Sequence, residues 1–159
     1  MRLAIITVGR LKDGPERDLC ERYRERSNAL GRSLGLSGPD VTELPESRAR
    51  RAEERKRDEA AAILSKLSPG LLIALDERGR SLTSDAFAGR IAASRDAGAG
   101  TASLVIGGAD GLDETIRDRA DLTLAFGALT LPHQLVRVLA LEQLYRAMTI
   151  IAGHPYHRA

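Results

Sequence analysis

The chain has 159 residues, 43% of them hydrophobic and 29% charged, so we expect one domain over residues 1–159 with a substantial core. Aromatic residues make up only 3% of the chain and tryptophan is absent, so that core must be aliphatic. The 24 basic residues nearly balance the 22 acidic ones, which permits a local nucleic-acid contact, while the single cysteine excludes an internal disulfide and a cysteine-rich zinc site.

The first half of the chain predicts two strands and two helices. A β-branched, apolar run over residues 2–9 indicates a buried strand, and residues 15–34 favour a helix with a loose apolar stripe. A turn is expected over residues 35–40, followed by a short strand over residues 41–44. Residues 46–67 predict a second helix that is charged at its start and apolar near its end.

The second half continues the alternation of strands and helices. Residues 70–76 form a continuous apolar run typical of a buried strand, and a helix follows that is capped near Leu82 and ends at Gly98. The remaining elements are a strand over residues 102–108, a short helix over 112–120, a strand over 121–127, and a long helix within 128–151 that has Pro132 in its first turn.

The order of the elements predicts the fold class. Five apolar strands alternate with helices, which indicates a parallel sheet covered on both faces by helices, an α/β fold. Ligands bind such sheets outside the carboxyl ends of the strands. We therefore expect ligand contacts from Leu75 and Asp76, from residues 107–111 and from residues 127–133.

A glycine-rich turn follows the fourth predicted strand. Gly107, Gly108 and Gly111 would let a ligand approach the backbone closely. The turn is not a dinucleotide fingerprint, because Ile106 occupies the first glycine position, and no Gly-Lys-Ser/Thr follows as in a P-loop. A tight turn without a ligand is the alternative interpretation.

Two segments, one charged and one apolar, are expected to form surfaces that face solvent or a partner. Residues 48–57 carry six basic residues beside Glu53 and Glu54, which favours a solvated helix face, with phosphate contact as the alternative. The final helix is apolar on most sides, and a last helix is not easily central in so small a chain. We therefore expect a homodimer interface as its second cover, with Glu142 and Arg146 paired on one face.

The last six residues concentrate histidine, tyrosine and arginine side chains. His154, Tyr156, His157 and Arg158 are side chains that stack on bases and contact phosphates, although a disordered polar end is the alternative. We expect no metal site, since Pro155 prevents a regular helix through both histidines and no carboxylate cluster accompanies them. No apolar run reaches the length of a membrane span, so we expect a cytoplasmic protein without a membrane partner.

Three segments, taken in order, resemble the ribosomal RNA large subunit methyltransferase H family: LVIGGADGL, LTLPHQLVRVLALEQLYRA and the terminal HPYHR. VGRLKDG near the start and LDERG after the third strand also fit, so the likeness covers essentially the whole chain. The resemblance implies a parallel-sheet SPOUT-type fold with a C-terminal trefoil knot. It also implies methyl transfer from S-adenosyl-L-methionine to N3 of a pseudouridine in 23S rRNA, by a homodimer acting on the assembled ribosome.

The resemblance also implies a site. The cofactor-binding residues carried over from the motifs are Leu75, Gly107, Gly108, Gly127, Ala128, Leu129, Thr130, Leu131 and Pro132. The N3 nitrogen must lose a proton, which His154, His157 or Glu142 could accept, unless they only hold the base. The candidate RNA-binding residues are Arg137, Arg146, Tyr156 and Arg158.

In a dimer the tail of one chain would lie beside the cofactor pocket of the other. The tail would then be ordered by the partner or by RNA and mobile in the free protein. Ala109 and Asp110 depart from the Pro-Glu pair expected in relatives, but Asp110 keeps the acidic character.

Three other functions stay open from the sequence. One is a methyltransferase of the same knotted class acting on another RNA, such as tRNA. Another is a non-catalytic ribosome-binding protein with a relic pocket, and the third is a nucleotide-binding α/β module unrelated to methylation.

Overall fold

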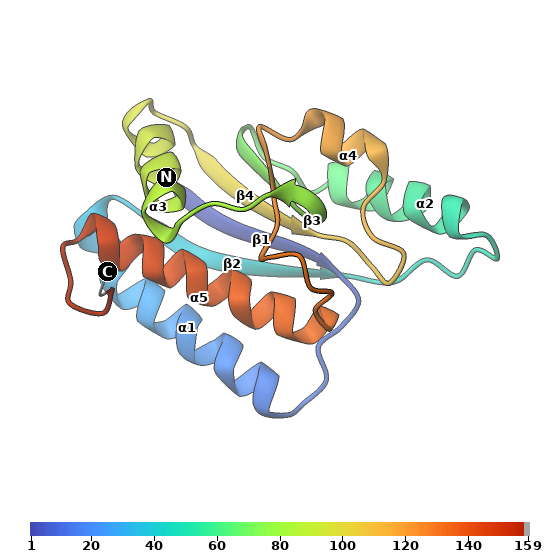
Figure 1. The fold of residues 1–159 in the computed structure, drawn as a ribbon, viewed down its shortest axis with the longest axis horizontal. Helices are drawn as coiled ribbons and strands as arrows, with labels where there is room; N and C mark the ends of the chain where they lie inside the picture. The colour runs from blue at the N-terminus through green and yellow to red at the C-terminus, as the bar shows by residue number, and fades with distance from the viewer. Residues whose placement is uncertain (158–159) are drawn as a thin grey trace.

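Five apolar segments form one parallel β-sheet in a computed structural model of the protein, which describes residues 1–157 (Figure 1). The strands are β1 (Arg2–Val8), β2 (Ser37–Leu44), β3 (Gly70–Arg80), β4 (Thr101–Ile106) and β5 (Leu122–Leu124). Their order in the sheet is β2-β1-β4-β3-β5, and every neighbouring pair is parallel. The α/β class predicted from the apolar runs is therefore confirmed.

Helices cover both faces of this sheet. They are α1 (Pro15–Gly31), extended by a 3-10 turn (Arg32–Leu34), α2 (Ala52–Leu64), α3 (Ser84–Asp96), α4 (Glu114–Arg119) and α5 (His133–Ile151). Successive strand residues point to opposite faces, so Ile73 packs with α1, α3 and α5 while Ala74 packs with α2 and α4. Figure 1 shows α2 and α4 together on one side and α1 and α5 side by side on the other.

Several predicted boundaries were wrong, each because of a contact made elsewhere in the fold. β2 begins inside the expected turn, at Ser37, where it pairs with β1. β3 continues past Asp76 to Arg80, which pairs with Leu124 of β5. Gly79 suits this crossing, since a Cβ there would lie 2.6 Å from the Leu124 carbonyl carbon.

The helices α2 and α5 both begin later than expected. Residues 46–51 stay outside the helix before α2, and side chains of that helix bond to their backbone groups. α5 begins at His133, and the preceding Pro132 has the extended angles φ −56° and ψ 136°. The cap predicted near Leu82 is confirmed, since the Thr83 side chain accepts a hydrogen bond from the Ala86 N–H at 3.2 Å.

α5 does not need a second subunit to bury most of its length, contrary to the expectation drawn from its apolar sides. α5 lies over the sheet between α1 and α3, and Leu141, Leu144 and Met148 are at most 2% exposed within this one chain. Among the described residues, the exposed large hydrophobic side chains are Leu129 and Leu135. The burial of α5 therefore gives no support for a homodimer.

Candidate functional site

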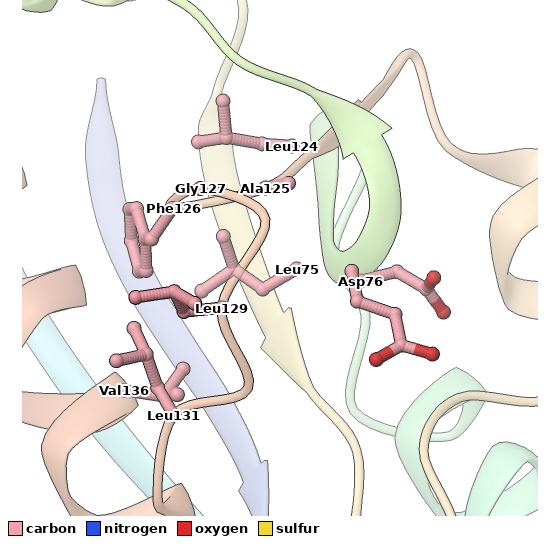
Figure 2. A pocket seen from close by; sticks show the side chains of 10 residues that line it. Leu75, Asp76, Leu124, Ala125, Phe126, Gly127, Leu129, Leu131 and Val136 are labelled. Carbon is pink, nitrogen blue, oxygen red and sulfur yellow. The ribbon is translucent and has the colours of Figure 1, made fainter.

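A cleft lies at the carboxyl ends of β3 and β4, beside the loop that leads from β5 to α5. Its walls come from Leu75 to Arg78 of β3, the turn from Gly107 to Leu112, and Leu131, His133 and Val136. A second hollow continues it under the loop, and both hollows share Leu75 and Leu131. Figure 2 shows the side chains of Leu129, Leu131 and Val136 on one side of this loop, with Leu75 drawn across it.

Six of the nine predicted cofactor-binding residues line this continuous cleft. They are Leu75, Gly107, Gly108, Gly127, Leu129 and Leu131. Ala128, Thr130 and Pro132 belong to the same loop, but they are exposed and do not line it. Several other lining residues were not expected from the sequence, notably Glu77, Phe126, Arg117 and Val136. His133 also lines the cleft; it lies within residues 127–133, from which ligand contacts were expected, but it was not among the nine cofactor-binding residues.

The glycine turn closes tightly on itself. Gly108 and Gly111 form an antiparallel bridge in which the Gly111 N–H donates to the Gly108 carbonyl at 3.0 Å. Gly111 has φ +82°, a conformation that favours glycine. A Cβ on Gly107 would lie 2.6 Å from the Gly111 carbonyl carbon and 2.8 Å from the Leu112 nitrogen. The turn therefore needs glycine at residue 107 for packing against its own backbone.

Replacing Gly107 by alanine should therefore weaken cofactor binding. The clashing atoms are all backbone, so the turn itself must move, and overpacking of this size raises a dissociation constant by about 10- to 100-fold. Isothermal titration with S-adenosylhomocysteine measures the effect. Gly89→Ala is the matched control, because nothing lies within 4 Å of its Cβ position and alanine is favoured within α3. Equal affinity in the two variants would contradict the expectation.

His133 connects the start of α5 to the glycine turn. Its Nε2 lies within hydrogen-bonding distance of the Gly107 carbonyl, which fixes Nε2 as the protonated nitrogen. The pKa of His133 is lowered, mainly because burial disfavours the charged imidazole, and the nearby Arg137 adds to the effect. A neutral His133 thus donates one hydrogen bond and holds the two walls of the cleft together.

Two ion pairs brace the turn from outside. Arg55 of α2 binds Asp110 with two hydrogen bonds, 2.6 Å from Nε to Oδ2 and 2.9 Å from Nη2 to Oδ1. This bond lowers the pKa of Asp110, so the carboxylate remains charged. Arg117 lies 3.4 Å from Asp76, whose other oxygen accepts the Arg78 N–H at 2.9 Å. The acidic character kept at Asp110 therefore serves to tie the turn to α2.

A buried carboxyl lies directly behind the turn. Glu59 is 6% exposed, and its Oε1 accepts the Ser47 N–H at 3.1 Å. Within residues 1–157 its Oε2 has no hydrogen-bond partner, and it would lie 2.7 Å from a Cβ on Gly108. Burial raises the pKa of Glu59 and outweighs the lowering by the Ser47 N–H.

This raised pKa makes a prediction for stability against pH. Because protonated Glu59 favours the folded state, its stabilising contribution is complete below the ordinary value of 4.5 and is lost as pH rises through the raised pKa. Glu59→Gln should therefore raise the melting temperature at pH 7.5 by about 2–4 °C, with a smaller gap near pH 5. Thermal denaturation from pH 5 to 8 tests this, with exposed Glu54→Gln as the control. A variant less stable than the wild type at pH 7.5 would contradict it.

The C-terminal residues form a polar cluster on the second half of α5. The Tyr156 ring packs edge-on against Tyr145 at 4.8 Å, and the Arg146 guanidinium lies 4.9 Å from its centroid. The Tyr156 hydroxyl donates to Glu142 at 3.1 Å. Burial, followed by the neighbouring Tyr23 and Glu142, raises the pKa of Tyr156, so its phenol stays neutral.

Both tail histidines are engaged in this cluster. His157 Nδ1 lies 3.4 Å from Arg146 Nη1, and its Nε2 lies 3.5 Å from the Asp85 carboxylate. His154 accepts the Tyr156 N–H on Nδ1 at 3.1 Å. Residues 154–157 thus pack on their own chain, and mobility of the tail in the free protein stays a prediction. Arg158, also predicted to bind RNA, lies outside the described residues.

Glu142 and Arg146 form the centre of the cluster. Arg146 Nε donates to Glu142 Oε1 at 2.9 Å, and Gln143 donates to Glu142 Oε2 at 2.6 Å. Both carboxylate oxygens of Glu142 are thus occupied, and the predicted pairing of Glu142 with Arg146 is confirmed. In this conformation the carboxylate holds Arg146 and Tyr156 in place.

Arg137, another predicted RNA contact, lies in the interior. It is 4% exposed, and its guanidinium donates to Glu43 at 2.7 Å and to the Val8 carbonyl at 3.0 Å and the Gly9 carbonyl at 2.6 Å. A guanidinium so enclosed joins α5 to the ends of β1 and β2. The sequence could not show this, because Glu43 lies 94 positions away in the chain.

The cleft and the tail cluster lie at different ends of α5. The helix begins at His133 beside the glycine turn, whereas the tail contacts residues from Glu142 onward. A helix rises 1.5 Å per residue, so Glu142 lies roughly 13 Å along the axis from His133. One chain therefore does not bring its tail to its own cleft.

Two features of residues 1–157 concern membrane and metal binding. None of their helices is long and apolar enough to cross a membrane. Within the same residues, no group of three or more potential ligands from His, Cys, Asp and Glu is placed to hold a metal ion.

Solved structures with the same fold are only distantly related in sequence. A probable methyltransferase from Bordetella pertussis aligns with a TM-score of 0.53 at 17% identity, over 92% of this chain and 95% of that one. A probable methylase family protein from Haemophilus influenzae gives a TM-score of 0.51 at 14% identity, over 99% of this chain and 70% of that one. These likenesses support the fold alone.

Sequence comparisons go further than the fold. The family model described as "Predicted SPOUT methyltransferase" matches residues 1–157. A protein of Methylorubrum populi named ribosomal RNA large subunit methyltransferase H is 64% identical, over 99% of this chain and 97% of its own. The protein of that name from Xanthobacter autotrophicus is 58% identical over the full length of both chains. The C-terminal trefoil knot is the topology that this class implies. The chain belongs to the SPOUT methyltransferase family.

Proposed function

We propose that this protein transfers a methyl group from S-adenosyl-L-methionine to N3 of a pseudouridine in 23S rRNA. The observation that carries the proposal is the full-length identity of 58–64% to proteins named ribosomal RNA large subunit methyltransferase H. The glycine turn and the loop before α5, which carry the family motifs, also form one cleft. The substrate is the assembled ribosome, and the protein therefore acts in the cytoplasm.

The cleft suits S-adenosylmethionine by the chemistry of its walls. Leu75, Leu129 and Leu131 offer apolar surface for the faces of an adenine ring, and backbone groups of the glycine turn offer hydrogen bonds to polar edges. Glu77 places a carboxylate in the lining of the cleft, beside a cofactor that is positively charged at sulfur, whereas Asp76 is paired with Arg117. The bound cofactor supplies an already activated methyl group, so the protein mainly has to hold and orient the acceptor.

The acceptor must be held where its N3 proton can leave. We assign this task to the tail cluster, in which Tyr156 and Arg146 offer a ring and a guanidinium suited to a base and a phosphate. His154 and His157 are the proposed proton acceptors or base-holding groups. Glu142 has both oxygens occupied, so its proposed part is to position Arg146 and Tyr156.

We further propose that the protein acts as a homodimer with a shared site. Within one chain the tail cluster and the cleft lie at opposite ends of α5, and a partner placed antiparallel along this helix would bring its tail to the cleft. Leu129 and Leu135, which are 84% and 42% exposed, lie at the cleft end of α5 and offer apolar surface for such a partner.

Transfer of radiolabelled methyl from S-adenosylmethionine tests the proposal. The acceptors are ribosomes that lack the modification, free 23S rRNA and bulk tRNA. Label on ribosomes that maps to N3 of a pseudouridine supports the proposed reaction. Label found only on tRNA overturns the substrate and keeps the methyltransferase. S-adenosylhomocysteine binding without any transfer would indicate a non-catalytic ribosome-binding protein, and no binding would favour an unrelated nucleotide-binding module.

A further inference from the structure

An exposed arginine-rich segment lies next to the glycine turn. Residues 47–51, called here the arginine arm, connect β2 to α2 and carry Arg48, Arg50 and Arg51. All three side chains are exposed, and among the described residues none of the three forms an ion pair. Figure 1 shows this connection beside the carboxyl ends of β1 and β2, at the same edge of the sheet as the turn after β4.

The arm is fixed in place although it has no regular secondary structure. The Ser47 N–H donates to Glu59 at 3.1 Å, and the Ser47 hydroxyl donates to Asp58 at 2.7 Å. The Ala49 N–H donates back to the Ser47 hydroxyl oxygen at 3.2 Å. These bonds satisfy backbone groups that a helix would otherwise pair. The arm is thus held by its own α2, with its three guanidinium groups directed to solvent.

Arg55 connects the arm to the cofactor cleft. Its Nη1 donates to the Ala49 carbonyl at 3.1 Å and to the Arg50 carbonyl at 3.0 Å. Its Nε and Nη2 bind the carboxylate of Asp110, which lines the cleft within the glycine turn. One planar guanidinium therefore spans both structures and sets their relative position.

Charge and placement identify the partner of the arm. Three unpaired guanidinium groups on a fixed backbone are suited to phosphate oxygens, which they bind with two parallel hydrogen bonds. Of the acidic side chains nearby, Glu53 pairs with Lys56 at 2.8 Å and Asp58 accepts the Ser47 hydroxyl, whereas within residues 1–157 the exposed Glu46 and Glu54 form no ion pair with the arm. The arm therefore presents a local positive charge that the nearly neutral composition of the whole chain does not reveal.

We propose that the arginine arm binds the phosphate backbone of the RNA substrate beside the methylated nucleotide, and that Arg55 is a positioning residue that fixes the arm relative to the cofactor turn. The inference rests on the proposed function for the identity of the RNA. It adds a contact surface from the first half of the chain, separate from the tail cluster. Phosphate contacts of this kind set the register of the RNA and carry no sequence information.

The test compares Arg48→Gln/Arg50→Gln/Arg51→Gln with a charge-matched control. Arg32→Gln/Arg90→Gln/Arg119→Gln removes three other exposed arginines; Arg32 starts the 3-10 turn before β2 and Arg119 ends α4 before β5, both away from the cleft. The arm variant should raise the KM for ribosomes about 10-fold and lower the slope of log affinity against log salt by about 2–3. Its affinity for S-adenosylhomocysteine should stay within about twofold of the wild type. A KM and a salt slope equal to those of the control would overturn the proposal.

Binding measurements separate this proposal from the reaction itself. Filter binding of ribosomes and of free 23S rRNA is measured for the same variants across a salt series. If the wild type binds RNA but transfers no methyl group, the proposed function fails, and the arm still stands if its variant alone loses salt-dependent affinity. If the wild type binds neither RNA, the arm proposal falls as well.

The role of Arg55 has its own pair of variants. Arg55→Gln should both weaken S-adenosylhomocysteine binding and raise the KM for ribosomes, because it releases the turn and the arm together. Asp110→Asn leaves the bonds from Arg55 to the arm and should mainly weaken the cofactor side. If both variants lower only the melting temperature and leave both binding constants unchanged, Arg55 has a structural role alone.

Discussion

Replacing Arg137 by alanine should lower the free energy of unfolding by about 3–5 kcal/mol, because it removes one partner of a buried ion pair and leaves polar groups without hydrogen bonds. The side chain is 4% exposed and satisfies Glu43 and two backbone carbonyls at the ends of β1. In a chain of this size the loss corresponds to a fall in melting temperature of roughly 10 °C. Chemical denaturation with urea gives the free energy directly.

Two further variants show whether the pairing itself is responsible. Arg90→Ala removes an exposed arginine from α3 and should change stability by less than about 0.5 kcal/mol. Glu43→Gln combined with Arg137→Ala should cost less than the sum of the single changes, because the partner charge is already absent. An Arg137→Ala protein as stable as the wild type, with weakened RNA binding, would restore the direct RNA contact predicted from the sequence.

Removing residues 154–159 should abolish most methyl transfer while the cofactor still binds. The expected loss in kcat is about 10²- to 10⁴-fold, the usual contribution of positioned proton-transfer groups. The affinity for S-adenosylhomocysteine should change little, since within one chain the tail contacts α5 and Asp85 rather than the residues that line the cleft, and the tail of the partner is proposed to hold the acceptor and not the cofactor. Single-turnover methylation of ribosomes and isothermal titration measure the two quantities. Tyr156→Phe, which loses only the hydroxyl bond to Glu142, should lose less activity than the truncation.

Mixing two inactive proteins tests whether the site is shared between subunits. One carries the truncated tail and the other carries Gly107→Val in the glycine turn. Random pairing of subunits makes half of the dimers mixed, and one of the two sites in each is complete, so about a quarter of the wild-type activity should return. If no activity returns although mixed dimers form, each chain uses its own tail.

The parts of the fold that could be predicted depend on local patterns. Buried strands such as β1 and β4 are uniform apolar runs. The side chain of Thr83 caps the start of α3, and such a cap can be recognised in the sequence. The extension of β3 to Arg80 could not be predicted, because the polar end of this strand pairs with Leu124, and this pairing exists only in the folded chain. The non-helical conformation of residues 46–51 likewise depends on hydrogen bonds to their backbone from Arg55 and Glu59 of the following helix.

The same distinction applies to the candidate site. The rule that ligands lie at the carboxyl ends of parallel strands correctly placed Leu75, Gly107 and the loop before α5 in one cleft. It could not reveal that Arg137 is buried against Glu43, nor that Arg55 joins two separate segments, because these pairs exist only in the folded chain. The expectation that α5 needs a second subunit to bury its apolar sides was wrong because α1 and α3 of the same chain flank α5.

The strand order has a consequence for how the protein is made. β1 is synthesised first, yet it lies between β2 and β4. β3 pairs with β5, which is synthesised later. The cleft draws its walls from β3, the turn after β4 and the start of α5, so the chain must be made nearly to its end before the cleft exists. Such distant pairings make folding slow. Cofactor binding therefore reports a finished chain, and a prematurely terminated product would neither bind the cofactor nor be stabilised by it.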